Sequence, residues 1–134
     1  MAHLLLIDDD EMVRGLIKEV VLMAGHTCDE AVNGSEGLAQ LRKGKYDLVI
    51  IDRNMPVMNG IQALTTLRAF PQYKDIKVLM CTSASVTKEV EEAFAAGATD
   101  YILKPINLQG LIDKIYDRSN TPSSAAPPSA PPRY

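Results

Sequence analysis

The sequence has few cysteines and no long apolar run, and these absences exclude several classes of protein. Its two cysteines, Cys28 and Cys81, lie far apart without a CxxC spacing, so they form neither a disulfide framework nor a zinc ligand set. We expect both to be buried small side chains. No apolar run approaches the roughly 20 residues that cross a bilayer, and the N-terminus lacks the pattern of a secretion signal. These features predict a soluble, cytoplasmic protein that does not contact a membrane.

An excess of positive charge is also missing. The chain has 17 acidic and 14 basic residues, a formal net charge of −3, which does not favour direct nucleic-acid binding by the folded part. No GxGxxG or GxxxxGK[ST] loop indicates a nucleotide site. His3 and His26 are isolated, without partners spaced for zinc or a catalytic triad. We assign both histidines structural roles.

Short apolar runs alternate five times with helical patterns along the 134 residues, a length that suits one domain. The expected strands are Leu4 to Ile7, Thr27 to Ala31, Leu48 to Ile51, Lys77 to Cys81 and Tyr101 to Leu103. The expected helices are Val13 to Ala24, Ser35 to Lys43, Ile61 to Arg68, Thr87 to Ala96 and a helix after Asn107. Continuously apolar strands suit a parallel sheet covered on both faces. The sequence therefore predicts a doubly wound α/β fold.

The composition changes after Ser119. The stretch from Thr121 to Pro132 contains only Thr, Ser, Ala and Pro, which cannot bury enough apolar surface to fold. We therefore predict a domain over residues 1–118 and a disordered tail or linker over residues 119–134. A flexible end and a tether to a further domain both fit this composition.

Polar side chains follow four of the predicted strands. Asp8, Asp9 and Asp10 follow the first strand, Asp52 the third, Thr82 and Ser83 the fourth, and Lys104 the fifth. The carboxyl ends of parallel strands meet at one edge of the sheet, where ligands bind in such folds. Carboxylates that converge there repel one another unless a cation joins them, and a few hard oxygen ligands suit Mg²⁺. This spacing predicts an acidic metal site.

Each of these residues also has a structural interpretation. Asp10 is expected only to cap a helix, and Lys104 would be an ordinary surface lysine were it not at a strand end beside Pro105. Thr82 could cap a helix or bind a phosphoryl group, and its position leaves both open. As a set, the residues indicate attack of a carboxylate on phosphorus, with Mg²⁺ and Lys104 offsetting charge on the oxygens.

Four segments together resemble the receiver domain of bacterial two-component response regulators. They are Leu-Ile-Asp-Asp-Asp at 6–10, Val-Ile-Ile-Asp-Arg-Asn-Met-Pro-Val-Met-Asn-Gly at 49–60, Leu-Met-Cys-Thr-Ser-Ala at 79–84 and Ala-Gly-Ala-Thr-Asp-Tyr-Ile-Leu-Lys-Pro at 96–105. The resemblance covers about residues 1–118. It implies a flavodoxin-like five-stranded parallel sheet of order 2-1-3-4-5, and a cis Lys104-Pro105 bond.

The resemblance also implies the roles of the site residues. Asp52 is the phosphoacceptor. Asp9 binds Mg²⁺, or Mn²⁺ in its place, directly and Asp8 binds it mainly through water; Asp52 and the backbone carbonyl of Asn54 are the further ligands. Lys104 is the phosphate partner, and Thr82 and Tyr101 are the switch pair. By the same resemblance, the donor is a phosphohistidine on a sensor histidine kinase or a histidine phosphotransfer protein. A downstream effector, or a second copy in a phosphorylation-dependent dimer, would use the face of the fourth helix, fifth strand and fifth helix.

Two rival functions remain at this stage. A pseudo-receiver that acts only in protein interaction usually lacks an acid or the lysine, and none is missing here. An aspartate-nucleophile phosphatase of the haloacid-dehalogenase type needs a second Asp two residues after the nucleophile, where this chain has Asn54. An amide cannot exchange a proton as a general acid or base. Ser83 and Arg53 depart from the family pattern, which leaves the phosphoryl lifetime and the cognate kinase open.

Overall fold

A computed structural model describes residues 2–83 and 87–120. Over these residues the chain forms one parallel sheet in the order β2-β1-β3-β4-β5, which confirms the predicted strand order. The strands are β1 (His3–Ile7), β2 (Thr27–Ala31), β3 (Leu48–Asp52), β4 (Lys77–Thr82) and β5 (Asp100–Leu103). Strands β3 and β4 each extend one residue beyond the predicted apolar run, so Asp52 and Thr82 are the last residues of their strands.

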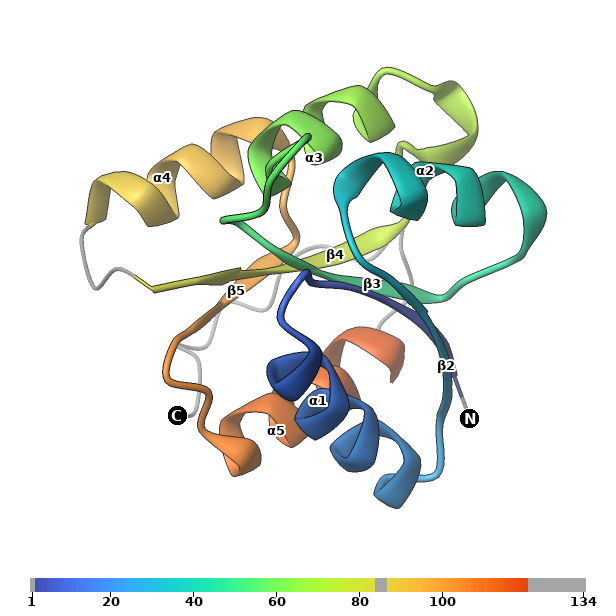
Figure 1. Ribbon diagram of the computed structural model, residues 1–134, viewed down its shortest axis with the longest axis vertical. Coiled ribbons are helices and arrows are strands. Elements are labelled where there is room, and N and C mark those ends of the chain that lie inside the picture. Colours follow the sequence, from blue (N-terminus) through green and yellow to red (C-terminus); the bar gives the residue numbers. More distant parts are fainter. Residues whose placement is uncertain (1, 84–86, 121–134) are drawn as a thin grey trace.

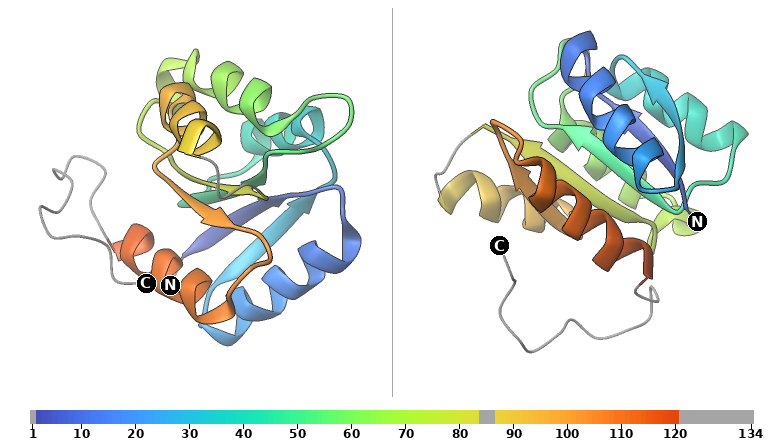
Figure 2. Two further views of the ribbon diagram at one scale, coloured as in Figure 1. Left: turned by 90° about the vertical axis from the view of Figure 1, so that its left-hand side faces the viewer. Right: turned by 90° about the horizontal axis from the view of Figure 1, so that it is seen from below.

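Helices cover both faces of the sheet (Figure 1). They are α1 (Glu11–Met23), α2 (Gly34–Lys43), α3 (Gly60–Arg68), α4 (Thr87–Ala96) and α5 (Leu108–Asn120), and a short 3₁₀ helix, η1 (Pro71–Tyr73), was not predicted. Helices α1 and α5 lie on one face and α2, α3 and α4 on the other, as both views in Figure 2 also show. The architecture is the predicted doubly wound α/β fold.

Side-chain caps fix where the helices begin. The Asp10 carboxylate accepts hydrogen bonds from the backbone N–H groups of Met12 and Val13, as predicted for this residue. Asn59 and Gln62 form a reciprocal capping box at the start of α3. Such caps satisfy N–H groups that have no partner inside the helix. They fix the helix starts just beyond the strand ends that carry the predicted site.

The sheet separates two apolar cores. Alternate β-strand residues point to opposite faces, so Leu5, Ile7 and Val49 pack under α2, α3 and α4, whereas Leu4, Leu6 and Ile50 pack against α1 and α5. Cys81 is buried in the second core as predicted, but the prediction for Cys28 was wrong because it is only partly buried. Cys28 lies on β2, an edge strand with a single neighbouring strand.

Both histidines make structural contacts. The imidazole Nδ1 of His26 accepts a hydrogen bond from the backbone N–H of Ala2 at 2.9 Å. The ring of His3 stacks on Tyr46 at 4.9 Å between centroids and contacts Asp29 at 3.2 Å. None of the helices in the described ranges is both long enough and apolar enough to span a membrane. Helix α5 ends at Asn120 and so includes the first two residues of the tail predicted over residues 119–134. The rest of that segment, residues 121–134, lies outside the described residues.

Candidate phosphoacceptor and metal site

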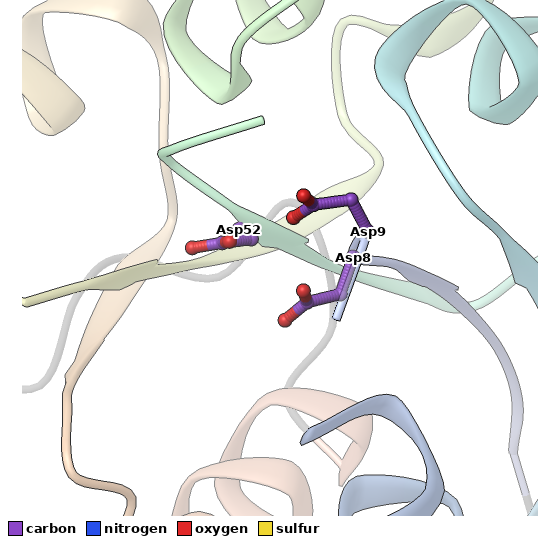
Figure 3. A group of neighbouring side chains, drawn as sticks. All are labelled: Asp8, Asp9 and Asp52. Atoms are coloured by element: carbon purple, nitrogen blue, oxygen red, sulfur yellow. The ribbon is translucent and has the colours of Figure 1, made fainter. Parts of the chain in front are cut away.

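Three carboxylates meet at the carboxyl edge of the sheet. Asp52 ends β3, and Asp8 and Asp9 directly follow β1, the strand paired with β3. One oxygen from each carboxylate lies within 4.8 Å of the other two. In Figure 3 the side chains of Asp8 and Asp9 reach from the end of β1 toward Asp52 at the end of β3. Asp8 and Asp52 are each only 3% exposed, whereas Asp9 is open to solvent.

The Asp8 carboxyl is held in place but incompletely satisfied. Its Oδ1 accepts a hydrogen bond from the backbone N–H of Asp10 at 2.9 Å, whereas Oδ2 is buried without a hydrogen-bond partner in the described part of the chain. Burial, with a further contribution from the charge of Asp52, raises the pKa of Asp8 to about 6. A buried oxygen without a donor, beside two further carboxylates, fits a hard cation such as Mg²⁺.

Lys104 supplies the positive charge next to Asp52. Its Nζ forms an ion pair with Asp52 Oδ1 at 2.8 Å. Burial disfavours the Lys104 ammonium, but Asp52 and Asp8 outweigh that effect and raise the pKa of the lysine above its ordinary value. Lys104 therefore stays protonated at neutral pH and is not a freely solvated surface lysine.

The strand ends around Asp52 are fixed by backbone contacts. The N–H of Lys104 donates to the carbonyl of Thr82 at 2.8 Å, and the N–H of Arg53 donates to the carbonyl of Cys81 at 2.9 Å. The side chain of Thr82 is fully buried. The Lys104-Pro105 peptide bond is cis, which agrees with the resemblance drawn from the sequence. Thr82, the last residue of β4, and Lys104, which follows β5, thus lie at the same edge of the sheet as Asp52.

Gly60 allows the next helix to start close to that edge. Its N–H donates to the carbonyl of Arg53 at 2.9 Å. A Cβ atom at this position would lie 2.4 Å from the backbone oxygen of Asp52 and 2.8 Å from the Cα of Arg53. Only glycine fits so near another backbone segment. The segment between Arg53 and Gly60, which contains the exposed Asn54, therefore forms a short loop whose two ends are joined by this hydrogen bond.

Tyr101 connects two helices near the site. The partly buried ring meets Phe94 of α4 edge-to-face at 6.0 Å between centroids. The ammonium of Lys114, on α5, lies over the same ring. Tyr101 was predicted as one member of a switch pair, and its ring is placed where a shift of α4 relative to α5 would change its packing.

Two groups of ion pairs were not predicted from the sequence, although Arg53 itself was noted there as a departure from the family pattern. Arg53, which directly follows Asp52, pairs with Glu89 and Glu92 of α4. Lys114 and Asp100 are both buried and paired with each other. For the first group, the spacing of the two glutamates was informative: residues three apart on a predicted helix lie on the same side of it and can bind one cation together. For the second group, Lys114 lies on the same helix face as the buried Leu111 and Ile115, and a lysine on an inward face needs a buried partner.

Comparison with known proteins decides the family. The model of the response regulator receiver domain matches residues 4–116. The chain belongs to this family. Among curated proteins, the receiver domain is 36% identical over 119 residues to chemotaxis protein CheY-3 of Vibrio cholerae, covering 86% of this chain and 92% of that protein. It is also 36% identical over 121 residues to chemotaxis protein CheY of Pseudomonas aeruginosa, covering 87% of this chain and 98% of that protein.

Solved structures agree with this assignment. The receiver domain matches the chemotaxis response regulator CheY4 of Vibrio cholerae with a TM-score of 0.82 and 34% identity, covering 89% of this chain and 98% of that one. It matches the receiver domain of the Francisella response regulator 1452 with a TM-score of 0.83 and 28% identity, covering 89% and 97% of the two chains. The fold is therefore that of CheY-like receiver domains, and the protein is a two-component signalling protein.

Proposed function

We propose that this receiver domain is a phosphorylation-activated signalling switch in which Asp52 accepts a phosphoryl group from a phosphohistidine. The observation that carries the proposal is the arrangement around Asp52. Its buried carboxylate lies 2.8 Å from Lys104 Nζ and shares a cluster with Asp8 and Asp9. A carboxylate so placed can act as a nucleophile, and the positive charge of Lys104 is already positioned for the incoming phosphoryl oxygens.

Mg²⁺ is the cofactor that these residues fit. Its ligands would be Asp8, Asp9, Asp52 and the backbone carbonyl of Asn54, and Mn²⁺ could take its place. The donor set consists of oxygen atoms only, and the buried Oδ2 of Asp8 provides one without a competing hydrogen bond. When bound, the ion would offset negative charge on the carboxylates and on the transferred group.

In the proposed step, an oxygen of Asp52 forms a bond to phosphorus while the P–N bond of the phosphohistidine breaks. The electron pair of that bond returns to the imidazole nitrogen of the donor. Lys104 changes partner from the carboxylate to a phosphoryl oxygen and carries its proton throughout, because its pKa is raised. Asn54, two residues after Asp52, cannot serve as a general base, which favours slow autodephosphorylation over enzymatic turnover.

The new phosphoryl group would be sensed by Thr82 and Lys104 and relayed through Tyr101. The donor is proposed to be a sensor histidine kinase or a histidine phosphotransfer protein. Phosphorylation would shift a pre-existing equilibrium between two arrangements of the α4–β5–α5 face. That face would then bind an effector or a second phosphorylated copy.

The main rival is a pseudo-receiver that only binds other proteins. The intact acidic cluster and the Lys104–Asp52 ion pair favour the phosphoacceptor, since a domain freed from phosphotransfer has no need to bury repelling carboxylates. An aspartate-nucleophile phosphatase is disfavoured because Asn54 stands where that enzyme needs a second Asp as general acid and base. We keep the pseudo-receiver as the alternative that the experiment must separate.

The test is intact-mass analysis after incubation with Mg²⁺ and acetyl phosphate. Wild type should gain the mass of one phosphoryl group, Asp52→Asn should gain none, and a chelator should abolish labelling. Asp10→Asn is the matched control, because it removes a carboxylate from the same run that caps α1 and should still be labelled. A wild type that gains no mass, or an Asp52→Asn variant labelled equally, would contradict the proposal and favour the pseudo-receiver.

A further inference from the structure

Arg53 makes three contacts with α4. Its Nε lies 3.0 Å from Glu89 Oε1, its Nη2 lies 3.0 Å from Glu92 Oε2, and its Nη1 donates to the backbone carbonyl of Glu89 at 3.4 Å. The side chain of Arg53 is 15% exposed, those of Glu89 and Glu92 27% and 44%. The whole guanidinium is therefore engaged by the first two turns of one helix.

The backbone of Arg53 is fixed as firmly as its side chain. Its N–H donates to Cys81 of β4, and its carbonyl accepts from Gly60 at the start of α3. Arg53 follows Asp52, and side chains alternate along a strand, so the guanidinium reaches α4 on the face opposite the Asp52 carboxylate. The residue thus joins the loop beside the phosphoacceptor to α4 and does not reach into the acidic site.

Few apolar side chains in the described part of α4 pack against the rest of the domain. Among the described residues of α4, Ala93 is the one buried apolar side chain, Val90 is partly buried, and Phe94, which packs on Tyr101, is 46% exposed. Ion pairs of an arginine that is mostly shielded from water hold better than fully exposed pairs. The contacts of Arg53 are therefore a substantial part of what fixes the orientation of α4.

We propose that Arg53, Glu89 and Glu92 form a brace that holds α4 in the resting arrangement, in which Lys104 pairs with Asp52, and opposes its shift on phosphorylation. This inference rests on the proposed function. Contacts that stabilise the resting arrangement must be broken for α4 to move, so they lower the affinity of the site for whatever favours the shifted arrangement. By reciprocity, replacing either Arg53 or the two glutamates should increase the affinity of the Asp52 site for a phosphoryl mimic.

The experiment measures calorimetrically how beryllofluoride, a stable phosphoryl mimic, binds in the presence of Mg²⁺. Arg53→Met and the double variant Glu89→Gln/Glu92→Gln should each bind about threefold to tenfold more tightly than wild type. Hydrogen exchange of the amides of residues 87–96 in the absence of the mimic should be faster in both variants. The combined triple variant should gain little more than either one, because both ends belong to one contact.

The two ends carry opposite charges, which separates a brace from simple electrostatics. If Arg53 acted only as a nearby positive charge, its removal would weaken binding of the anion while removal of the glutamates would strengthen it. Glu91→Gln is the control, since this residue is exposed on the same helix and its replacement removes one negative charge, as each glutamate substitution of the double variant does; it should bind like wild type. If Arg53→Met and the double glutamate variant change the beryllofluoride affinity in opposite directions, or if neither changes it, the brace proposal is wrong. A wild type that binds no beryllofluoride would instead overturn the proposed function.

Discussion

The ammonium of Lys114 lies 4.2 Å from the centre of the Tyr101 ring. The same Nζ donates to the backbone carbonyl of Tyr101 and pairs with Asp100 at 3.2 Å. Asp100 also pairs with Arg118 at 3.0 Å and accepts from the N–H of Tyr101. One buried cation therefore fixes both the backbone and the ring of the proposed switch residue, a combination of ion pairing and cation–π contact.

Replacing Lys114 by Met should destabilise the receiver domain by about 2–4 kcal/mol, because it leaves buried Asp100 with a weakened set of partners. Urea unfolding followed by circular dichroism measures the effect. Lys43→Met, on the exposed side of α2, is the control and should stay within about 0.5 kcal/mol of wild type. Equal stability of the two variants would show that the buried pair contributes nothing.

Asp8→Asn should change stability in opposite senses with and without metal. In a chelator, the variant should be about 1–3 kcal/mol more stable than wild type, because it removes a buried charge whose pKa is raised to about 6. The hydrogen bond from the Asp10 N–H can pass to the amide oxygen. In millimolar Mg²⁺, wild type should gain stability and the variant much less. Thermal unfolding in the two buffers tests this, and parallel shifts of both proteins would count against a metal ligand.

The raised pKa of Asp8 also predicts the pH dependence of the metal-free protein. With an ordinary value of 3.8 and a folded value of about 6, the unfolded chain loses this proton first as pH rises. The contribution of Asp8 to stability is therefore greatest below about pH 4, declines through about pH 6 and is constant above. The difference in unfolding free energy between wild type and Asp8→Asn in chelator should trace this decline. A difference that does not vary over this range would refute the assignment.

Gly60→Ala should disturb the site through the backbone. The added Cβ would lie 2.4 Å from the Asp52 carbonyl oxygen, so the start of α3 must move away from the strand end, at a cost of about 1–3 kcal/mol. The affinity for Mg²⁺ should fall with it. Gly15→Ala is the control, since a Cβ added there would meet no described atom within 4 Å; it should stabilise α1 by up to about 1 kcal/mol. Both are measured by unfolding, with Mg²⁺ titration for the first.

Val57 holds backbone strain in the loop after Asp52. Its φ is 72° and its side chain is 84% exposed, so a β-branched residue occupies the left-handed region with no packing to compensate. Val57→Asn should raise stability by about 1 kcal/mol because asparagine tolerates this conformation better. Val32→Asn, at an exposed residue with no positive φ, is the comparison. If Val57→Asn and Val32→Asn change the free energy of unfolding equally, the effect at Val57 does not come from relief of backbone strain.

The sheet and its acidic edge could be predicted from the sequence because each depends on local pattern. Four continuously apolar residues before Asp52 indicate a buried strand, and parallel strands bring Asp8, Asp52 and Lys104 to one edge whatever the loops do. The Arg53 and Lys114 contacts depend instead on which face of α4 and α5 turns inward and how far a long side chain reaches. The partial exposure of Cys28 follows from the position of β2 at the sheet edge, which the strand order implied by the resemblance already contained; the expectation of burial rested on residue type alone.

Cys81 lies beside Asp52 in the register of β3 and β4, which has a chemical consequence for the proposed acyl phosphate. An acyl phosphate is a mixed anhydride and therefore an electrophile that a neighbouring thiolate could attack. Complete burial, aided by the charge of Asp52, raises the pKa of Cys81 to about 12, so at pH 7 only about one molecule in 10⁵ carries the thiolate. The apolar core beneath the sheet thus protects the signal by keeping its nearest sulfur protonated.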